Sequence, residues 1–201
     1  MNLGSILEIA VLMKDSATNL HRLLENLLQW SRLQRGMIPF NPQEISISKV
    51  VERIQQPLSE SLRNKQIELT INIPAEATVY ADENMLESTI RNLFSNAIKF
   101  CTKGGKILIS GKKLSTGETE ISVKDTGIGM AEDIAEKLFR IDQVECRQGT
   151  EGEPSTGLGL ILCKDFMDKH NGKIWVESIE NMGSSFYLSF PPCSPNSDVH
   201  I

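Results

Sequence analysis

An apolar residue recurs every three or four positions through the first 30 residues, and this spacing fixes the first element of the fold. The series runs through Ile6, Ile9, Met13, Ser16, Leu20, Leu23, Leu27 and Trp30, and seven of these eight residues, all except Ser16, are apolar. Alternate steps of three and four line up one face of a helix, as in the seam of a coiled coil. Gly36 is suited to end that helix, and Pro39 prevents its continuation. We therefore predict a helix over residues 1–36 that needs a partner helix, from a second copy or from upstream sequence, to bury its stripe.

After a linker at 37–42 the pattern changes to short alternating strands and amphipathic helices. Helices are predicted at 49–64, 83–100, 131–140 and from about 158 to 170, and strands at 67–73, 79–81, 106–113, 118–124, 173–178 and 184–190. Residues 147–157 are rich in Gly, Glu, Ser and Thr and lack apolar periodicity, which predicts a mobile loop. The series predicts one α+β domain over 43–192 and a frayed tail over 193–201.

Charge and cysteine usage limit the partners and the compartment. The 21 Lys+Arg against 26 Asp+Glu leave a net charge of −5, which argues against a protein that wraps nucleic acid with a basic stripe. The four cysteines lack zinc spacing and are expected to be reduced thiols. No apolar run reaches the ~18 residues of a membrane span. We therefore expect a cytoplasmic location and no contact with nucleic acid or membrane, even if a longer parent protein is membrane-bound.

Three polar residues share one face of the helix predicted at 83–100. Asn92, Asn96 and Lys99 are spaced four and three apart, beside the apolar stripe of that helix. An amide oxygen can ligate Mg²⁺, and a lysine supplies a point charge for phosphate. An ordinary solvated face would have the same pattern, so the helix alone leaves both interpretations open.

A second candidate motif, Asp-Thr-Gly-Ile-Gly at 125–129, directly follows a predicted strand. Its glycines, Gly127 and Gly129, allow a sharp turn and a close approach of backbone to a ligand. The Asp125 carboxylate could accept a hydrogen bond from the exocyclic amine of adenine, whereas guanine offers a carbonyl there. A simple β-turn is the alternative.

The third motif, Thr-Gly-Leu-Gly at 156–159, ends the loop and opens a helix. Glycines at a helix start expose N–H groups where the helix dipole favours anions, so a di- or triphosphate fits there. Close helix packing through glycine is the alternative. No G-x-x-x-x-G-K-[ST] sequence occurs, which excludes a P-loop.

The order of the three motifs resembles the catalytic, ATP-binding domain of sensor histidine kinases. That superfamily also contains DNA gyrase B, MutL and the heat-shock chaperone ATPases. Residues 92–100 are similar to its N box, 125–129 to its first glycine box and 157–159 to its second; residues 171–178 and 183–186 are similar to its closing hairpin. The resemblance implies a two-layer α/β sandwich of the Bergerat type, with a mixed sheet covered on one face by helices and preceded by a long N-terminal bundle helix.

The resemblance also implies a role for each motif. Asn96 would ligate Mg²⁺, with Asn92 and Lys99 near the phosphates of ATP, and Asp125 would bind adenine through a water shared with Ser185. Residues 140–156 would form a lid, with Phe139 as a reduced F box. The predicted nucleotide-binding set is Asn92, Asn96, Lys99, Asp125, Gly127, Gly129, Thr156, Gly157, Leu158, Gly159 and Ser185, with Asn96 as the metal ligand.

The N-terminal helix resembles the second helix of the family's dimerisation hairpin. This implies a homodimer of the parent protein and a response regulator or receiver domain as partner. The phosphoacceptor histidine of the family lies on the preceding helix and is followed by an acidic residue, whereas His21 is followed by Arg22. We therefore expect no acceptor histidine in these 201 residues, and we expect His170 and His200 to be surface residues.

The expected function is transfer of the γ-phosphoryl group of Mg-ATP to a histidine on an upstream helix, so the chain alone should not phosphorylate itself. The alternatives are an ATPase-type conformational switch and a serine-phosphorylating kinase of the anti-sigma type. Relatives that hydrolyse ATP for conformational work generally place a glutamate where this chain has Asn92. A third alternative is a binding module with a regulatory or degenerate nucleotide site.

Overall fold

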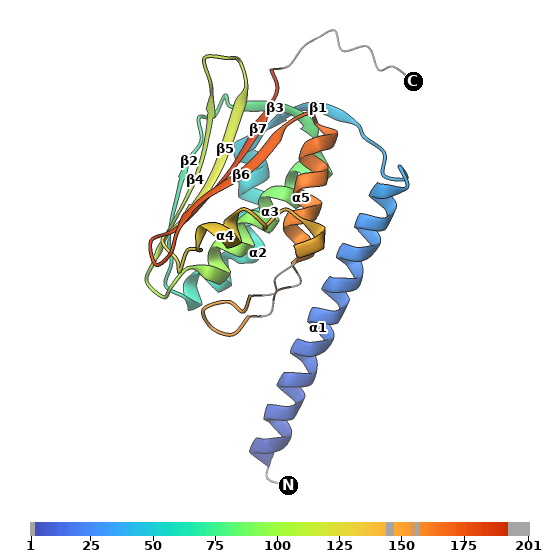
Figure 1. Cartoon of the computed structure of the whole chain (residues 1–201). Helices are drawn as coiled ribbons and strands as arrows, with labels where there is room; N and C mark the ends of the chain where they lie inside the picture. Colours follow the sequence, from blue (N-terminus) through green and yellow to red (C-terminus); the bar gives the residue numbers. More distant parts are fainter. Residues whose placement is uncertain (1–2, 144–146, 154, 156, 193–201) are drawn as a thin grey trace.

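A long N-terminal helix lies beside a two-layer α/β unit (Figure 1). The structure, a computed structural model, describes residues 3–143, 147–153, 155 and 157–192. Helix α1 (Leu3–Gln34) ends where predicted: Gly36 has a φ of +66°, its N–H donates to the Leu33 carbonyl, and the Met37 N–H donates to that of Arg32. Both bonds satisfy carbonyls at the end of the helix.

The main sheet has five strands in a mixed arrangement, as predicted. Their spatial order is β2 (Glu68–Asn72), β4 (Lys106–Lys113), β5 (Thr119–Asp125), β7 (Gly183–Phe190) and β6 (Lys173–Ile179). β2 and β4 are parallel, and the other neighbours are antiparallel. The predicted strand boundaries differ from these by one residue or less at each end.

Three helices cover one face of this sheet and leave the other face open (Figure 1). They are α2 (Ile47–Asn64), α3 (Glu83–Phe100) and α5 (Leu158–Lys169). Phe94 of α3 and Ile109 and Ile121 of the sheet are fully buried in the core between the layers. Asp82 caps α3 by accepting a hydrogen bond from the Met85 N–H.

A second, two-stranded sheet was not predicted in full. β1 (Pro42–Ser46) pairs antiparallel with β3 (Thr78–Asp82), and Ile45 lies opposite Val79. The sequence predicted only the middle of β3 and no strand at 42–46. Between Pro42 and Ser46 the sequence is Gln-Glu-Ile, with one apolar residue, so this segment has no alternating pattern that would predict a strand.

The helix predicted at 131–140 is much shorter in the structure. α4 spans Glu132–Ala135, and the chain then continues through i→i+3 bonds, such as that from the Arg140 N–H to the Lys137 carbonyl, into a 3₁₀ turn at Ile141–Gln143. The tighter winding lets both Leu138 and Phe139 pack against the main core. Phe139 is thus partly buried against the core, and its assignment to a reduced F box stays a prediction.

His170 is buried, contrary to the surface position that we expected. Its Nε2 accepts a hydrogen bond from the Asp82 N–H at 2.9 Å, and its Nδ1 lies 2.6 Å from the Phe166 carbonyl oxygen, to which it donates in that tautomer. Phe40 and Phe190 pack edge-on against its ring. The ring thus supplies an acceptor for the N–H of Asp82, the N-cap residue of α3, and burial lowers the pKa of His170. His200 lies outside the described residues.

The contacts described between helix α1 and the α/β unit lie in the C-terminal part of the helix. Leu33 is buried with Leu162 and Phe166 of α5, and the Gln34 side chain donates to the Asp165 carboxylate at 3.2 Å. Toward the N-terminus the apolar stripe stays exposed: Ile9, Met13, Leu20, Leu23, Leu24, Leu27 and Leu28 are between 37% and 68% exposed. Among the described residues, no helix combines the length and hydropathy needed to cross a bilayer.

Candidate functional site

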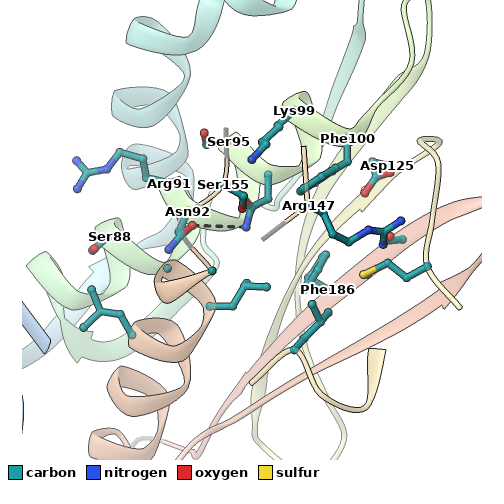
Figure 2. Close-up of a pocket in the computed structure, with 18 of the residues that line it drawn as sticks. Ser88, Arg91, Asn92, Ser95, Lys99, Phe100, Asp125, Arg147, Ser155 and Phe186 are labelled. Atoms are coloured by element: carbon teal, nitrogen blue, oxygen red, sulfur yellow. Dashed lines mark hydrogen bonds between the residues drawn. The ribbon is translucent and has the colours of Figure 1, made fainter. Parts of the chain in front are cut away.

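A single cavity of about 820 Å³ collects most of the predicted site residues. Its walls come from α3, from the segment after β5, from Arg147, Ser155, Gly157 and Gly159, and from one side of α1. Figure 2 shows the part of the wall formed by α3, Asp125, Arg147 and Ser155. Cavities of ~300–1,000 Å³ are the usual size for small-molecule sites. Of the predicted residues, those that line it are Asn92, Asn96, Lys99, Asp125, Gly129, Gly157 and Gly159.

Helix α3 presents its polar face to this cavity. The Asn96 side-chain amide donates to the Asn92 amide oxygen at 3.5 Å, across one helical turn. Lys99 follows three residues later, and its Nζ lies 5.0 Å from the centroid of the Phe100 ring. The opposite face of α3 buries Leu86, Ile90 and Leu93 in the core. The spacing that predicted a cleft-facing polar face is therefore realised as one wall of the cavity.

Asp125 lies on the other side of the cavity from Asn92 (Figure 2). It ends the central strand β5 and is only 3% exposed. Burial raises the pKa of the Asp125 carboxyl to about 6, although hydrogen bonds from the backbone of Gly127 and Ser184 act in the opposite direction. Among the described residues Asp125 forms no ion pair, and a buried carboxylate of this kind is suited to accept a hydrogen bond from a ligand.

The glycines after Asp125 are required by the backbone around them. A Cβ on Gly127 would lie 2.1 Å from the Phe100 carbonyl oxygen, and one on Gly129 would lie 2.0 Å from that of Ile179. Gly129 also has a φ of +60°. Gly127 is not itself in the cavity wall; it lets the turn pack against the end of α3, so that Asp125 and Lys99 face the same space.

The start of α5 forms the wall next to Asn92. Gly157 is the N-cap residue with a φ of +69°, and it has no side chain with which to cap the first turn. A Cβ on Gly159 would lie 2.3 Å from the Asn92 amide nitrogen, so only glycine allows this contact between α5 and α3. The first turn of α5, whose N–H groups have no partner within the helix, therefore lies close to the amide face of α3. Leu158 is not in the cavity wall, and Thr156 lies outside the described residues.

Ser185, which was predicted to share a water with Asp125, does not line the cavity. Side chains alternate along a strand, and Ser184 and Phe186 line the cavity, whereas Ser185 shares the outer face of the sheet with Tyr187. The serine in the cavity wall is Ser184, which pairs with Asp125 in the register of β5 and β7. The alternation of buried residues in β7 could have identified it.

Several residues of the wall were not predicted from the sequence. The apolar part beside Asp125 consists of Met130, Ile134, Leu138 and Phe186. The polar side gains Ser88 and Ser95, which continue the spacing of Asn92 along α3 and could have been found by it. Glu25, Leu28, Gln29 and Arg32 of α1 complete the wall, and only the docking of α1 brings them there.

Several hydrogen bonds hold the described part of the predicted lid against the rest of the domain. The Arg147 guanidinium donates to the Gly129 carbonyl at 3.5 Å and lines the cavity. The Thr150 N–H donates to the Lys99 carbonyl at 3.1 Å. The predicted mobility of residues 147–157 and the lid role of 140–156 remain predictions. Residues 144–146, 154 and 156 lie outside the described part of the chain.

The donor set of the cavity fits Mg²⁺ only together with a polyphosphate. Within the described ranges, no group of three or more His, Cys, Asp and Glu side chains could hold a metal ion. Asn96 offers an amide oxygen, and Mg²⁺ usually completes its six ligands with waters and phosphate oxygens. One side of the cavity holds the Asn92 and Asn96 amides, the Lys99 ammonium and the start of α5, which suit phosphates. The other side holds an apolar wall and Asp125, which suit adenine. Together they match a phosphorylated adenine nucleoside.

Comparisons with known proteins agree with this geometry. Residues 81–194 match the family described as "Histidine kinase-, DNA gyrase B-, and HSP90-like ATPase". The chain is 32% identical, over 174 residues, to the adaptive-response sensory kinase SasA of Crocosphaera subtropica. That alignment covers 86% of this chain and 45% of SasA, so the chain spans about half the length of this relative.

Solved structures give the same result. The nucleotide-free catalytic domain of histidine kinase ThkA is similar over 75% of this chain and 95% of its own, with 29% identity and a TM-score of 0.65. ThkA in complex with the response regulator TrrA covers 96% of this chain and 53% of its own at 21% identity, with a TM-score of 0.74. Acinetobacter baumannii AdeS covers 96% and 88%, also at 21% identity, with a TM-score of 0.75. The last two likenesses establish the fold alone.

Proposed function

Because the chain belongs to the family of histidine kinase-, DNA gyrase B-, and HSP90-like ATPases, we propose that it is the ATP-binding catalytic portion of a two-component sensor histidine kinase. It would transfer the γ-phosphoryl group of Mg-ATP to a histidine on an upstream helix outside these 201 residues. The observation that carries this proposal is the single cavity that joins the buried Asp125 carboxylate to the amide and ammonium face of α3.

Asp125 selects the base. Its carboxylate accepts a hydrogen bond from the exocyclic amine of adenine, whereas the carbonyl of guanine would place two acceptors together. Met130, Ile134 and Phe186 cover the faces of the base and exclude water, which strengthens that hydrogen bond. Ser184 lies opposite Asp125 in the sheet, and its N–H helps to hold the carboxylate.

The other side of the cavity neutralises the phosphates. Lys99 supplies a positive charge, and the uncapped N–H groups at the start of α5 donate to phosphate oxygens. Asn96 would hold Mg²⁺ through its amide oxygen, and that ion supplies charge neutralisation at the phosphates. Phosphoryl transfer depends mainly on such positioning and charge, so the chain needs no nucleophile of its own.

The histidines and Asn92 support transfer to a histidine elsewhere. His170 is buried with both ring nitrogens in hydrogen-bond contact, and His21 is an exposed residue of α1 with its Nδ1 3.6 Å from a Glu25 oxygen. An imidazole needs little base assistance to attack phosphorus, but water needs more. The Asn92 amide cannot accept a proton, so hydrolysis by this chain should be slow.

We also propose the division of the chain and its partners. Residues 1–36 act as a helix of a dimerisation hairpin, 37–42 as a linker, 43–192 as the catalytic domain and 193–201 as a tail. The exposed stripe of α1 supports a homodimer of the parent protein. ThkA was crystallised with its response regulator, which supports a receiver protein as the partner here.

The test has two parts. The chain is titrated with ATP and GTP, with and without Mg²⁺, and we expect binding of ATP and rejection of GTP. The parent polypeptide that includes the upstream helix is then incubated with labelled ATP, and acid-labile phosphate is measured. Absence of ATP binding would overturn the proposal, and rapid ATP hydrolysis without phosphohistidine would favour the conformational ATPase instead.

A further inference from the structure

Lys65, at the end of α2, has an unusual position for a lysine: it is only 3% exposed. Its Nζ lies within hydrogen-bond distance of two backbone carbonyls at the end of α3, those of Ile98 (3.1 Å) and Lys99 (2.9 Å). It also donates to the Thr150 hydroxyl at 2.8 Å and forms an ion pair with the Glu153 carboxylate at 2.5 Å. One ammonium thus joins α2, the end of α3 and the loop at 149–153.

These contacts make the position of the loop costly to change. Carbonyls at a helix C-terminus carry partial negative charge, which favours a cation there. The Glu153 carboxylate neutralises the remainder of the buried charge. Burial acts to raise the pKa of Glu153, but hydrogen bonds from Lys65 and from the loop backbone lower it overall. If the loop moved away, the ammonium would stay buried without its carboxylate and its hydroxyl partner, a state that is strongly disfavoured.

The loop in turn contacts the lysine that faces the cavity. A Cβ on Gly149 would lie 2.6 Å from the Lys99 Cγ, so the Gly149 backbone lies directly against the aliphatic stem of Lys99. The Thr150 N–H and hydroxyl both donate to the Lys99 carbonyl, at 3.1 and 3.2 Å. The loop therefore contacts Lys99 at both its backbone and its side chain, while the Phe100 ring lies beside the ammonium.

On the basis of the nucleotide site proposed above, we propose that Lys65 is a positioning residue for the phosphate side of that site. It holds the loop at 149–153 against the end of α3 through Thr150 and Glu153, and the loop holds Lys99 in the cavity wall. Lys65 itself does not line the cavity, so it acts through Lys99 and not on the ligand. Replacing Lys65 should therefore weaken nucleotide binding only by the amount that the contacts between Lys99 and the phosphates contribute.

The first test uses Glu153→Gln, which removes the charge from the exposed end of the ion pair and leaves the core intact. We expect faster hydrogen exchange at the Thr150 amide and an ATP affinity about tenfold lower, with unchanged affinity for adenosine. Glu151→Gln is the matched control, since Glu151 is exposed in the same loop and is outside the Lys65 cluster. It should leave the exchange rate and both affinities at their original values.

The second test is a double-mutant cycle between Lys65→Met and Lys99→Met. Each single variant should weaken ATP binding, and Lys65→Met should have no further effect when Lys99 is already replaced. Equal loss of ATP and adenosine binding, additive losses in the cycle, or unchanged ATP binding in Glu153→Gln would overturn the positioning role alone. Failure of the unmodified chain to bind ATP would overturn the proposed function, and this inference with it.

Discussion

The Asp125 carboxylate accepts a hydrogen bond from the Gly127 N–H at 2.8 Å, so the turn that follows β5 fixes the orientation of this acid. The acceptor is thus in place before a ligand binds. Gly127 can hold it there because its Cα packs against the Phe100 carbonyl, where a side chain would clash. This preorganisation lowers the cost of binding the base, since no side chain has to be ordered first.

We predict that Asp125→Asn weakens ATP binding by tenfold or more. The asparagine has the same shape, but it loses the charge and can turn a donor toward the amine of adenine. A buried hydrogen bond to a charged group contributes ~1.5–3 kcal/mol, which corresponds to this loss. Calorimetric titration measures it, with Asp133→Asn on the exposed start of α4 as the control. Equal affinities of wild type and Asp125→Asn would contradict the adenine assignment.

The raised pKa of Asp125, about 6, predicts that adenosine affinity falls as the pH is lowered through that value. The ionised carboxylate is the form that accepts from the amine, and protonation removes it. Adenosine is the suitable ligand because it has no phosphate that titrates in the same range. The affinity should be measured between pH 8 and 5, and Asp125→Asn should abolish the dependence. A dependence that persists in this variant would mean that another group is responsible.

Asn96 should matter only when both Mg²⁺ and phosphates are present. We predict that Asn96→Ala removes most of the increase in ATP affinity that Mg²⁺ produces and leaves adenosine binding unchanged, because an amide oxygen is lost from the metal site. Titrations with and without Mg²⁺ measure this difference. Asn72→Ala, on the exposed end of β2, is the control. If Mg²⁺ raises the ATP affinity of Asn96→Ala as much as that of wild type, the ion is held elsewhere.

The lowered pKa of His170 predicts a loss of stability in weak acid. The unfolded chain binds a proton near the ordinary value of about 6.5, whereas the buried ring resists protonation. The stabilisation is therefore complete above about pH 6.5 and declines as the pH falls toward the lower pKa of the folded protein. Asp125, with its raised pKa, contributes a change of opposite sign below about pH 6.

Comparison with His170→Gln separates the two contributions, because Asp125 is the same in both proteins. We expect the free energy of unfolding of His170→Gln, measured in urea, to be lower than that of wild type at pH 8 by about 1–3 kcal/mol. The difference should narrow as the pH falls below 6.5. A constant difference across that range would show that His170 does not titrate differently on folding.

The elements that the sequence predicted well are those whose own pattern specifies them. Helix α3 has an apolar stripe, a capping Asp82 and a polar face, and all three signals lie within 19 residues of each other. The hairpin of β4 and β5 has alternating strands and a turn at Gly117 with a φ of +86°. The cavity wall formed by Asn92, Asn96 and Lys99 follows directly from the helical spacing.

The features that the sequence analysis missed depend on partners distant in the chain. β1 becomes a strand because β3, more than 30 residues later, pairs with it. The burial of His170 depends on the Asp82 N–H, 88 residues away. Which of Ser184 and Ser185 faces the cavity depends on which alternate side chains of β7 point inward. Both residues are serine, so local composition cannot separate them.

The exposed stripe of α1 leads to a final prediction about assembly. Leu20 and Leu27 are 57% and 47% exposed, whereas Leu33 on the same helix is buried against α5, so the stripe can be altered without disturbing that contact. We predict that Leu20→Lys combined with Leu27→Lys abolishes self-association in sedimentation velocity experiments and leaves ATP affinity unchanged, because two charges would have to be buried between helices. The pair Leu20→Met and Leu27→Met keeps the apolar surface and should still associate. Self-association that survives both lysines would place the contact elsewhere on the protein.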